Sequence, residues 1–297
     1  MSANIAKRLQ RPLEDTARGV SADPSGAVDR ALAVLCAFSR EHPALGVTEI
    51  SERLNLTKST VHRLLQALLL RGLVAQDPHK RQYTLGYRVL ALATAVPGEA
   101  TLRQICRQHM AWLQSVTGET IALYVVAGDV RLCLDEIESP HMLRMSAGIG
   151  RCFPLHRGAA SKALLAAGPA DAATWQRAVA TLSAEEQARL AAEIDRLRSR
   201  GYADSAGETV PGAASVAAPI YGPNGAVAAA LSVAGPASRF GEAAGWRHAA
   251  RLIEAIGHIE RDLHAGQMTG SATPAHTAKA DGHSDMERDS DIDTPHA

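Results

Sequence analysis

The stretch at 47–72, VTEISERLNLTKSTVHRLLQALLLRG, limits the possible fold more than any other part of this chain. Ile50 and Leu54 are four residues apart, as on one face of a short helix, and Thr48 can cap that helix. Asn55 tolerates the left-handed conformation in which helices end. The pattern therefore predicts a short helix, a tight turn and a second helix.

The second predicted helix has one apolar stripe and one polar face. Thr57 can cap its start, and Gly72 is placed to end it. The stripe, at i, i+3, i+4 and i+7, consists of Val61, Leu64, Leu65 and Leu68. The outward face consists of Lys58, Ser59, Thr60, His62, Arg63 and Gln66. A face that has many donors and no acid suits the DNA major groove. The alternative is a solvated face of an ordinary helical hairpin, but such faces usually mix both charge signs.

A basic hairpin follows this helix. Residues 73–76 and 82–85 alternate apolar and polar side chains around a polar turn whose tip carries Lys80 and Arg81. Two helices and then a basic hairpin make a winged helix-turn-helix, with the hairpin placed to touch the DNA backbone or the minor groove. The candidate DNA contacts are Thr48, Thr57, Lys58, Ser59, Thr60, His62, Arg63, Gln66, Lys80 and Arg81.

Several stretches together resemble the IclR-type transcriptional regulators. They are AVDRALAVLCAF (27–38), the helix-turn-helix, YTLGYRVLALA (83–93), PLHRGAASKALLA (154–166), RGYADSAGETVPGAASVAAPI (200–220) and AALSVAGPASRF (229–240). The resemblance spans roughly residues 26 to 264. It implies DNA binding by the first part and a sensor domain like the GAF and PAS folds in the second.

The distribution of charge supports two parts with different roles. A chain of 297 residues is long enough for about two domains. Nine Lys and Arg face five Asp and Glu in 25–95, and sixteen face seventeen in 96–265. A basic first domain beside a nearly neutral second one suits a DNA reader joined to a sensor.

The expected fold class is α+β. The second domain mixes strands and helices without the regular alternation of a parallel α/β fold, which favours an antiparallel sheet with flanking helices. The expected parts are a flexible arm (1–24), the winged helix-turn-helix domain (25–86), a linker helix (87–101), an effector-binding domain (102–265) and a disordered acidic tail (266–297).

A homodimer is expected, because one such helix reads only a few base pairs. A helix at 28–38 should pack behind the helix-turn-helix. The residues expected in that packing are Val28, Leu32, Leu35 and Cys36. This helix and the linking helix near 87–95 are the candidate dimer contacts. The resemblance also allows a tetramer.

The sequence favours a cytoplasmic protein. No run of eighteen apolar residues could span a membrane, and no apolar segment follows the N-terminal charges as in a secretion signal. The cysteines are too widely spaced to suggest a metal or a redox centre, and small buried residues are expected. They are Cys36, Cys106, Cys133 and Cys152.

Patterns typical of enzymes are missing from the second domain. Ser161 and Lys162 are adjacent and so lack the S-x-x-K spacing of serine acylases. No G-x-S-x-G or H-E-x-x-H occurs, and nothing nearby completes a metal site with Cys152 and His156. We therefore expect no enzyme, no cofactor and no bound metal.

A pocket for an anion is expected where a small-residue helix starts near Gly158, because free N–H groups at a helix start attract carboxylates. The candidate effector contacts are Leu143, Met145, Gly158, Ala159, Ala160, Ser205, Ser215, Ser232 and Ala234. From the residues alone, packing of these small side chains between helix and sheet explains them equally well. The resemblance implies a small organic acid at the matching positions. Ala234 departs from some relatives, which have a hydroxyl there, and 205–207 departs from relatives that have acidic residues before Glu208. Both departures favour a larger or less polar acid.

The favoured function is a DNA-binding transcriptional regulator whose affinity for operator DNA changes with a small carboxylic acid. One alternative is an enzyme of small-acid metabolism with an appended DNA-binding module, which turnover of candidate acids would reveal. The other is a DNA-binding protein without a ligand, which would show no ligand-induced rise in melting temperature. Repression and activation remain equally open.

Overall fold

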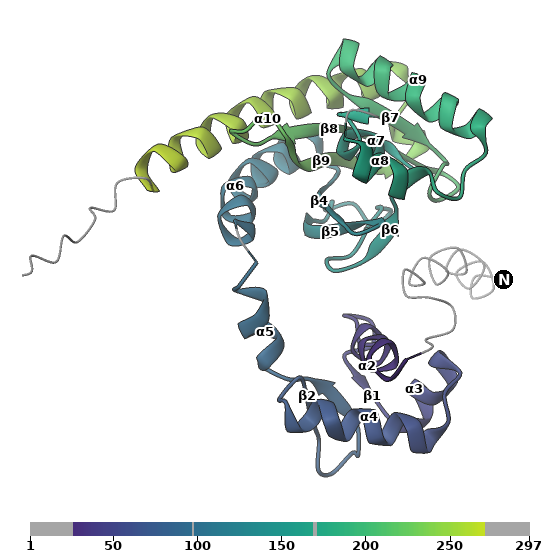
Figure 1. Ribbon diagram of the computed structural model, residues 1–297. Coiled ribbons are helices and arrows are strands. Elements are labelled where there is room, and N and C mark those ends of the chain that lie inside the picture. Colours follow the sequence, from purple (N-terminus) through teal and green to yellow (C-terminus); the bar gives the residue numbers. More distant parts are fainter. Residues whose placement is uncertain (1–25, 97, 169–170, 271–297) are drawn as a thin grey trace, which may run out of the picture.

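The computed structural model describes residues 26–96, 98–168 and 171–270. Buried side chains form one core between Val34 and Tyr83 and two more between Cys106 and Ile259. Helix α5 (Arg88–Ala93) joins the two parts (Figure 1). The expected arm and the expected tail beyond 270 lie outside the described residues.

The first part is a winged helix-turn-helix. Its elements are α2 (Ala27–Cys36), β1 (Ala44–Leu45), α3 (Val47–Leu54), α4 (Lys58–Leu70), β2 (Val74–Gln76) and β3 (Tyr83–Leu85). The antiparallel sheet has the order β1-β3-β2. The predicted apolar stripe of α4 is buried along its whole length, which confirms the period read from the sequence. Strand β1 was missed, because two residues show no alternation.

Helix α2 buries a different face from the one expected. Ala33 and Val34 are buried against the domain core, whereas Val28 is 72% exposed, Leu32 is 51% exposed and Cys36 is exposed. The sequence AVDRALAVLC is apolar on nearly every side, so its period does not decide which face turns inward. The expected packing through Val28, Leu32 and Cys36 is wrong.

The caps of the helix-turn-helix agree with the sequence at three of four positions, one of which is Gly72, with φ 69° just after α4. Asn55 ends α3 with φ 50°, and Thr57 caps α4. Thr48, however, lies inside α3, which starts one residue earlier. Gly46 is its N-cap, and the Glu49 carboxylate accepts a hydrogen bond from the Gly46 N–H at 2.7 Å. The expected cap at Thr48 is therefore wrong.

The second part is a six-stranded antiparallel sheet with helices on both faces, which confirms the α+β class. Its strands are β4 (Thr120–Ala127), β5 (Val130–Ile137), β6 (Cys152–Pro154), β7 (Ala203–Ala206), β8 (Ala213–Tyr221) and β9 (Val227–Pro236). Their order is β6-β5-β4-β9-β8-β7. The short strands β6 and β7 stand at the two edges.

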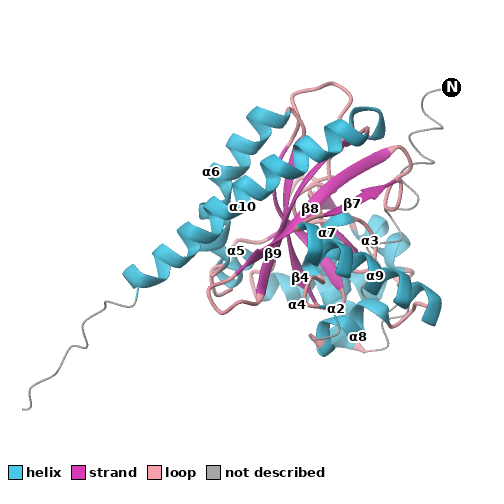
Figure 2. Ribbon diagram, turned by 90° about the horizontal axis from the view of Figure 1, so that it is seen from above, coloured by secondary structure: helices cyan, strands magenta, loops and turns pink. Residues whose placement is uncertain are grey.

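The helices divide between the two faces of this sheet (Figure 2). Helices α6 (Glu99–Thr117) and α10 (Glu242–Gly270) cover one face, where Leu113 and Leu252 are buried. The other face carries α7 (Ala159–Leu164), α8 (Ala172–Val179) and α9 (Ala184–Arg200). Each face of the sheet is therefore a core of its own.

The ends of two long helices can be compared with the ends that the sequence predicts. Ser183 and Glu186 form the predicted capping box of α9, and Gly201 ends that helix with φ 85°. Helix α10 continues to Gly270, past its expected end at His264, so the expected boundary at 265 falls inside a helix. No described helix is both long and apolar enough to cross a membrane.

Candidate functional site

The polar face of α4 is open to solvent. Lys58, Ser59, His62 and Arg63, which we call the donor face, are all exposed. Helix α4 contains no acidic residue. The donor face can therefore offer hydrogen bonds to an anionic surface without a carboxylate of its own helix in competition.

Three other expected contacts at the start of α4 or along it have partners within the domain. The Thr57 hydroxyl accepts from the Thr60 N–H at 3.3 Å and lies 2.9 Å from the Thr60 hydroxyl. The Gln66 side chain donates to the Tyr83 hydroxyl on β3 at 3.3 Å. These bonds fix the helix start and tie α4 to the hairpin. Thr48 is exposed on α3.

The hairpin turn is held by its first residue. The Asp77 carboxylate accepts from the N–H groups of His79 at 2.8 Å and Lys80 at 3.1 Å. These bonds hold the pKa of Asp77 below its ordinary value. Arg81 is left-handed, with φ 52°. The side chains of Lys80 and Arg81 are exposed at the tip, as the sequence predicts.

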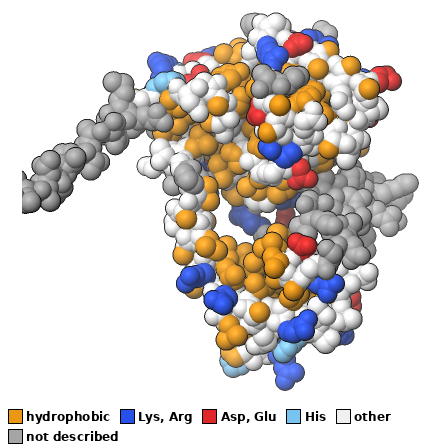
Figure 3. Space-filling view, viewed as in Figure 1, with side chains coloured by type: hydrophobic (Ala, Val, Ile, Leu, Met, Phe, Trp, Pro, Cys, Tyr) orange, Lys and Arg blue, Asp and Glu red, His pale blue; other side chains and the backbone are white. Residues whose placement is uncertain are grey.

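Apolar side chains remain exposed on α2 and around α5 (Figure 3). Besides Val28 and Leu32, Tyr87 is 89% exposed, Leu90 is 63% exposed and Leu92 is 57% exposed. The helices named above as candidate dimer contacts thus carry uncovered apolar surface.

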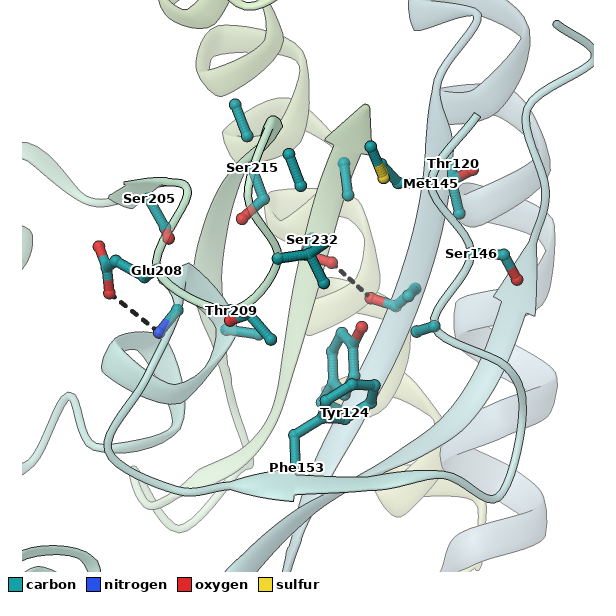
Figure 4. Close-up of a pocket in the computed structure, with 18 of the residues that line it drawn as sticks. Thr120, Tyr124, Met145, Ser146, Phe153, Ser205, Glu208, Thr209, Ser215 and Ser232 are labelled. Carbon is teal, nitrogen blue, oxygen red and sulfur yellow. Dashed lines mark hydrogen bonds between the residues drawn. The ribbon is translucent and has the colours of Figure 1, made fainter. Parts of the chain in front are cut away.

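A cavity of about 100 Å³ lies in the second domain between the sheet and α7 (Figure 4). Of the expected effector contacts, those that line it are Met145, Gly158, Ala160, Ser205, Ser215, Ser232 and Ala234. Leu143 and Ala159 do not line it. Leu143 is 65% exposed, and the Ala159 side chain is buried in the helix packing.

Strand register brings the distant serines of this cavity together. Ser205 on β7 is paired with Ser215 on β8, which is paired with Ala234 on β9. Ser232 lies two residues before Ala234 on β9, and its hydroxyl donates to the Ala122 carbonyl at 3.4 Å. Residues that are two apart on a strand share a face, so these side chains point into one space.

The backbone at the start of α7, which lines the cavity, is already hydrogen-bonded to a carboxylate of the protein. The Gly158 N–H donates to Glu208 Oε2 at 3.1 Å, as Figure 4 shows. Lys162 Nζ lies 2.6 Å from Glu208 Oε1 and 2.6 Å from Glu193. The expectation of a free donor at Gly158 is therefore wrong. The Glu208 carboxylate, which is 50 residues away in the sequence, already accepts the hydrogen bond of this N–H group.

Charged residues missed by the sequence reading also line the cavity. They include Arg131 and Glu136, which are 5% and 8% exposed. Arg131 Cζ lies 4.7 Å from the ring centroids of Tyr124 and Phe153, and burial lowers its pKa. The sequence could have indicated this position, because Arg131 is two residues from Cys133 on β5 and its side chain therefore points to the same buried face. The cavity is more polar than the sequence reading assumed.

Glu136 holds the loop that closes one side of the cavity. Its carboxylate accepts from the Ser146 hydroxyl at 2.6 Å, the Ala147 N–H at 2.6 Å and the Gly148 N–H at 3.2 Å. These bonds satisfy both carboxylate oxygens. Glu136 therefore shapes the cavity wall and has little capacity left for a ligand.

No described group of three or more His, Cys, Asp or Glu side chains could hold a metal ion. Burial raises the pKa of Cys106 and of Cys133 to about 12, as expected for buried thiols. The described arrangement thus combines an exposed face of donors in the first domain with a hydroxyl-lined cavity in the second.

Family models match both parts of the chain. The model described as bacterial transcriptional regulator IclR C-terminal matches residues 94–261, and that described as IclR helix-turn-helix domain matches residues 27–78.

Individual proteins agree with this match. The HTH-type transcriptional regulator BhcR of Paracoccus denitrificans is 34% identical, over 90% of this chain and 96% of its own. The regulator XynR of Escherichia coli is 31% identical, over 73% and 88%. Among solved structures, an IclR homolog of Microbacterium hydrocarbonoxydans complexed with 4-hydroxybenzoate is 25% identical with a TM-score of 0.67, over 81% of this chain and all of that one.

Proposed function

Because the chain belongs to the IclR family of bacterial transcriptional regulators, we propose that a small organic acid in its cavity changes its affinity for operator DNA. The observation that carries this proposal is the pairing of an acid-free donor face on α4 with a separate cavity that is lined by a buried arginine. The protein acts in the cytoplasm, where the bacterial chromosome lies. It acts by binding DNA and effector and not by catalysis.

The DNA half of the proposal rests on α4 and the hairpin. Ser59 and Arg63 are placed to reach base edges, because they lie on the exposed side of a helix whose opposite side is buried. Lys80 and Arg81 at the hairpin tip contact phosphates, which adds affinity without sequence preference.

The protein binds this DNA as at least a dimer. The uncovered apolar side chains of α2 and of the segment around α5 support this assembly, since contiguous exposed apolar surface usually marks a protein interface. Two copies would present two α4 helices to two half-sites of a partly palindromic operator.

The effector half rests on the polar groups of the cavity. Ser205, Ser215 and Ser232 supply hydroxyls, and Arg131 supplies positive charge. The relative complexed with 4-hydroxybenzoate supports an organic acid as the ligand class of this fold.

A melting screen against small carboxylic acids tests the ligand first, since a ligand that binds only the native state raises the melting temperature. Any acid that stabilises the protein is then added to a DNA-binding titration. A stabilising acid that changes DNA affinity supports the regulator. Melting curves that no acid shifts favour a DNA-binding protein without a ligand.

A further inference from the structure

A buried arginine at one end of the cavity has no counter-ion of its own. Arg131 reaches the cavity from β5 and is 5% exposed, and its Nε is buried without a hydrogen-bond partner. The acid that acts on it electrostatically is Glu208, whose oxygens already accept from the Gly158 N–H and from Lys162. A buried cation whose charge no carboxylate of its own balances is costly, so Arg131 is poised for an anion that enters the cavity.

Two aromatic rings flank this guanidinium. Tyr124 and Phe153 stand nearly edge to face, at 78°, and each ring centroid is 4.7 Å from Arg131 Cζ. Burial raises the pKa of Tyr124, so this neighbour is a neutral phenol and not a counter-ion. Rings that hold the guanidinium leave its N–H donors, which lie at its edge, as the part that can bind a carboxylate.

The backbone at Gly158 packs closely against this edge, so that a side chain at this position would not fit. A Cβ at Gly158 would lie 2.7 Å from the Thr209 hydroxyl and 3.4 Å from Arg131 Nη2. Arg131, Thr209 and Gly158 therefore meet at one end of the cavity. Since the Gly158 N–H is bonded to Glu208, the guanidinium is the stronger donor at this end.

We propose that Arg131 binds the carboxylate of the effector edge-on, beside Gly158 and Thr209, and that the effector is a small monocarboxylate. This rests on the proposed function, in which the cavity holds an acid. Two cations, Arg131 and Arg151, and two acids, Glu136 and Glu208, line the cavity. A monocarboxylate adds one negative charge to this balanced set, whereas a dicarboxylate brings a second one close to Glu136 and Glu208, which repel it.

Calorimetric titration of the full chain tests this assignment. The probes are acetate, pyruvate, lactate and 4-hydroxybenzoate, each with its uncharged amide, together with the dicarboxylate malonate. Arg131→Gln should raise the dissociation constant of the tightest acid at least about 30-fold, because charge-assisted hydrogen bonds are lost. It should change that of the amide less than about threefold. Arg144→Gln is the matched control, because it removes an exposed arginine that pairs with Glu138 outside the cavity.

A folded Arg131→Gln protein that binds the acid within about threefold of wild type overturns the assignment and leaves the proposed function intact, since an acid still binds. Malonate as the tightest ligand overturns the monocarboxylate class. Wild-type protein that binds none of the probes contradicts the acid-responsive part of the proposed function and this inference with it.

If Arg131→Gln does not fold, a crystal structure of the wild-type protein with its tightest acid decides the question. Carboxylate oxygens within about 3.2 Å of the Arg131 nitrogens are the expected result. A carboxylate bound instead to backbone N–H groups of α7 overturns the assignment.

Discussion

The hydroxyl oxygen of Thr57 accepts a hydrogen bond from the backbone N–H of Thr60 at 3.3 Å. This cap fixes the first turn of α4, on which Lys58 and Ser59 are exposed and the Ser59 hydroxyl lies 3.1 Å from that of Thr57. The start of a helix also attracts anions through its free N–H groups and its dipole. The recognition of a DNA sequence by this protein should therefore depend on the first turns of α4.

Replacing Ser59 and Arg63 together by Ala should abolish preference for the operator. Both side chains are exposed, so the melting temperature should stay close to that of wild type. A bidentate contact of arginine with guanine contributes about 1–3 kcal/mol of discrimination. Competition between operator and random DNA measures the effect, with Arg177→Ala in the second domain as control. Undiminished discrimination by the double variant would rule out this role for α4.

Replacing Lys80 and Arg81 by Ala should weaken binding to every DNA sequence by a similar factor. Two lost phosphate contacts should reduce the slope of log affinity against log salt by about two. Titrations at several salt concentrations, on operator and on random DNA, measure this slope. A loss confined to the operator would mean that the hairpin reads bases.

A charge on the exposed apolar surface should separate the protomers. Leu32 and Leu90 are 51% and 63% exposed, so Asp at both positions should leave each protomer folded while it disrupts the dimer. Met142→Asp, at a residue that is 99% exposed in the second domain, is the control. Sedimentation on operator DNA should show a dimer or tetramer for the control and a monomer for the double variant. A wild-type protein that sediments as a monomer would contradict the assembly.

Two buried thiols should make stability fall at alkaline pH. Burial raises the pKa of Cys106 and of Cys133 to about 12 from an ordinary value of 9.0. A group whose pKa is raised by folding loses its stabilising effect as pH rises, here between about 9 and 12. The loss is roughly 1 kcal/mol per thiol and pH unit in that window. Urea unfolding at pH 8 and pH 10 should show a smaller loss in the Cys106→Ala and Cys133→Ala double variant than in wild type. Equal losses would contradict this account.

The fold was predictable where one period dominates the sequence. The stripe of α4 and the capping box of α9 have a single consistent reading, and both are present. Helix α2 is apolar on most sides, so only tertiary contacts decide that Ala33 and Val34 turn inward. Strands β1, β6 and β7 have four residues or fewer, and the sequence lacks there the pair of alternating segments around a polar turn that marks the equally short β2 and β3.

The cavity was predictable in its serines and not in its charges. Ser215 and Ser232 stand on strands that the sequence predicts, whereas the position of Ser205, on the short β7, follows only from the family resemblance. Glu208 reaches Gly158 across 50 residues of sequence, and Arg131 takes its place between two rings from different strands. Contacts of this kind depend on strand order, which neither period nor composition contains.

The affinity of the protein for its operator with and without a bound acid tests the central claim most directly. The operator fragment is one that the purified protein selects from random DNA, and the acid is the tightest ligand of the melting screen. By linkage, an acid that prefers one of the two states must change operator affinity by the same factor, typically about 5- to 150-fold.

The same titration is carried out with the double variant Ser215→Ala and Ser232→Ala, and with Ser199→Ala as control, since Ser199 is exposed on α9. The double variant should bind operator normally without acid and respond only at higher acid concentrations than wild type. An operator affinity that saturating acid leaves unchanged in the wild-type protein would contradict the account.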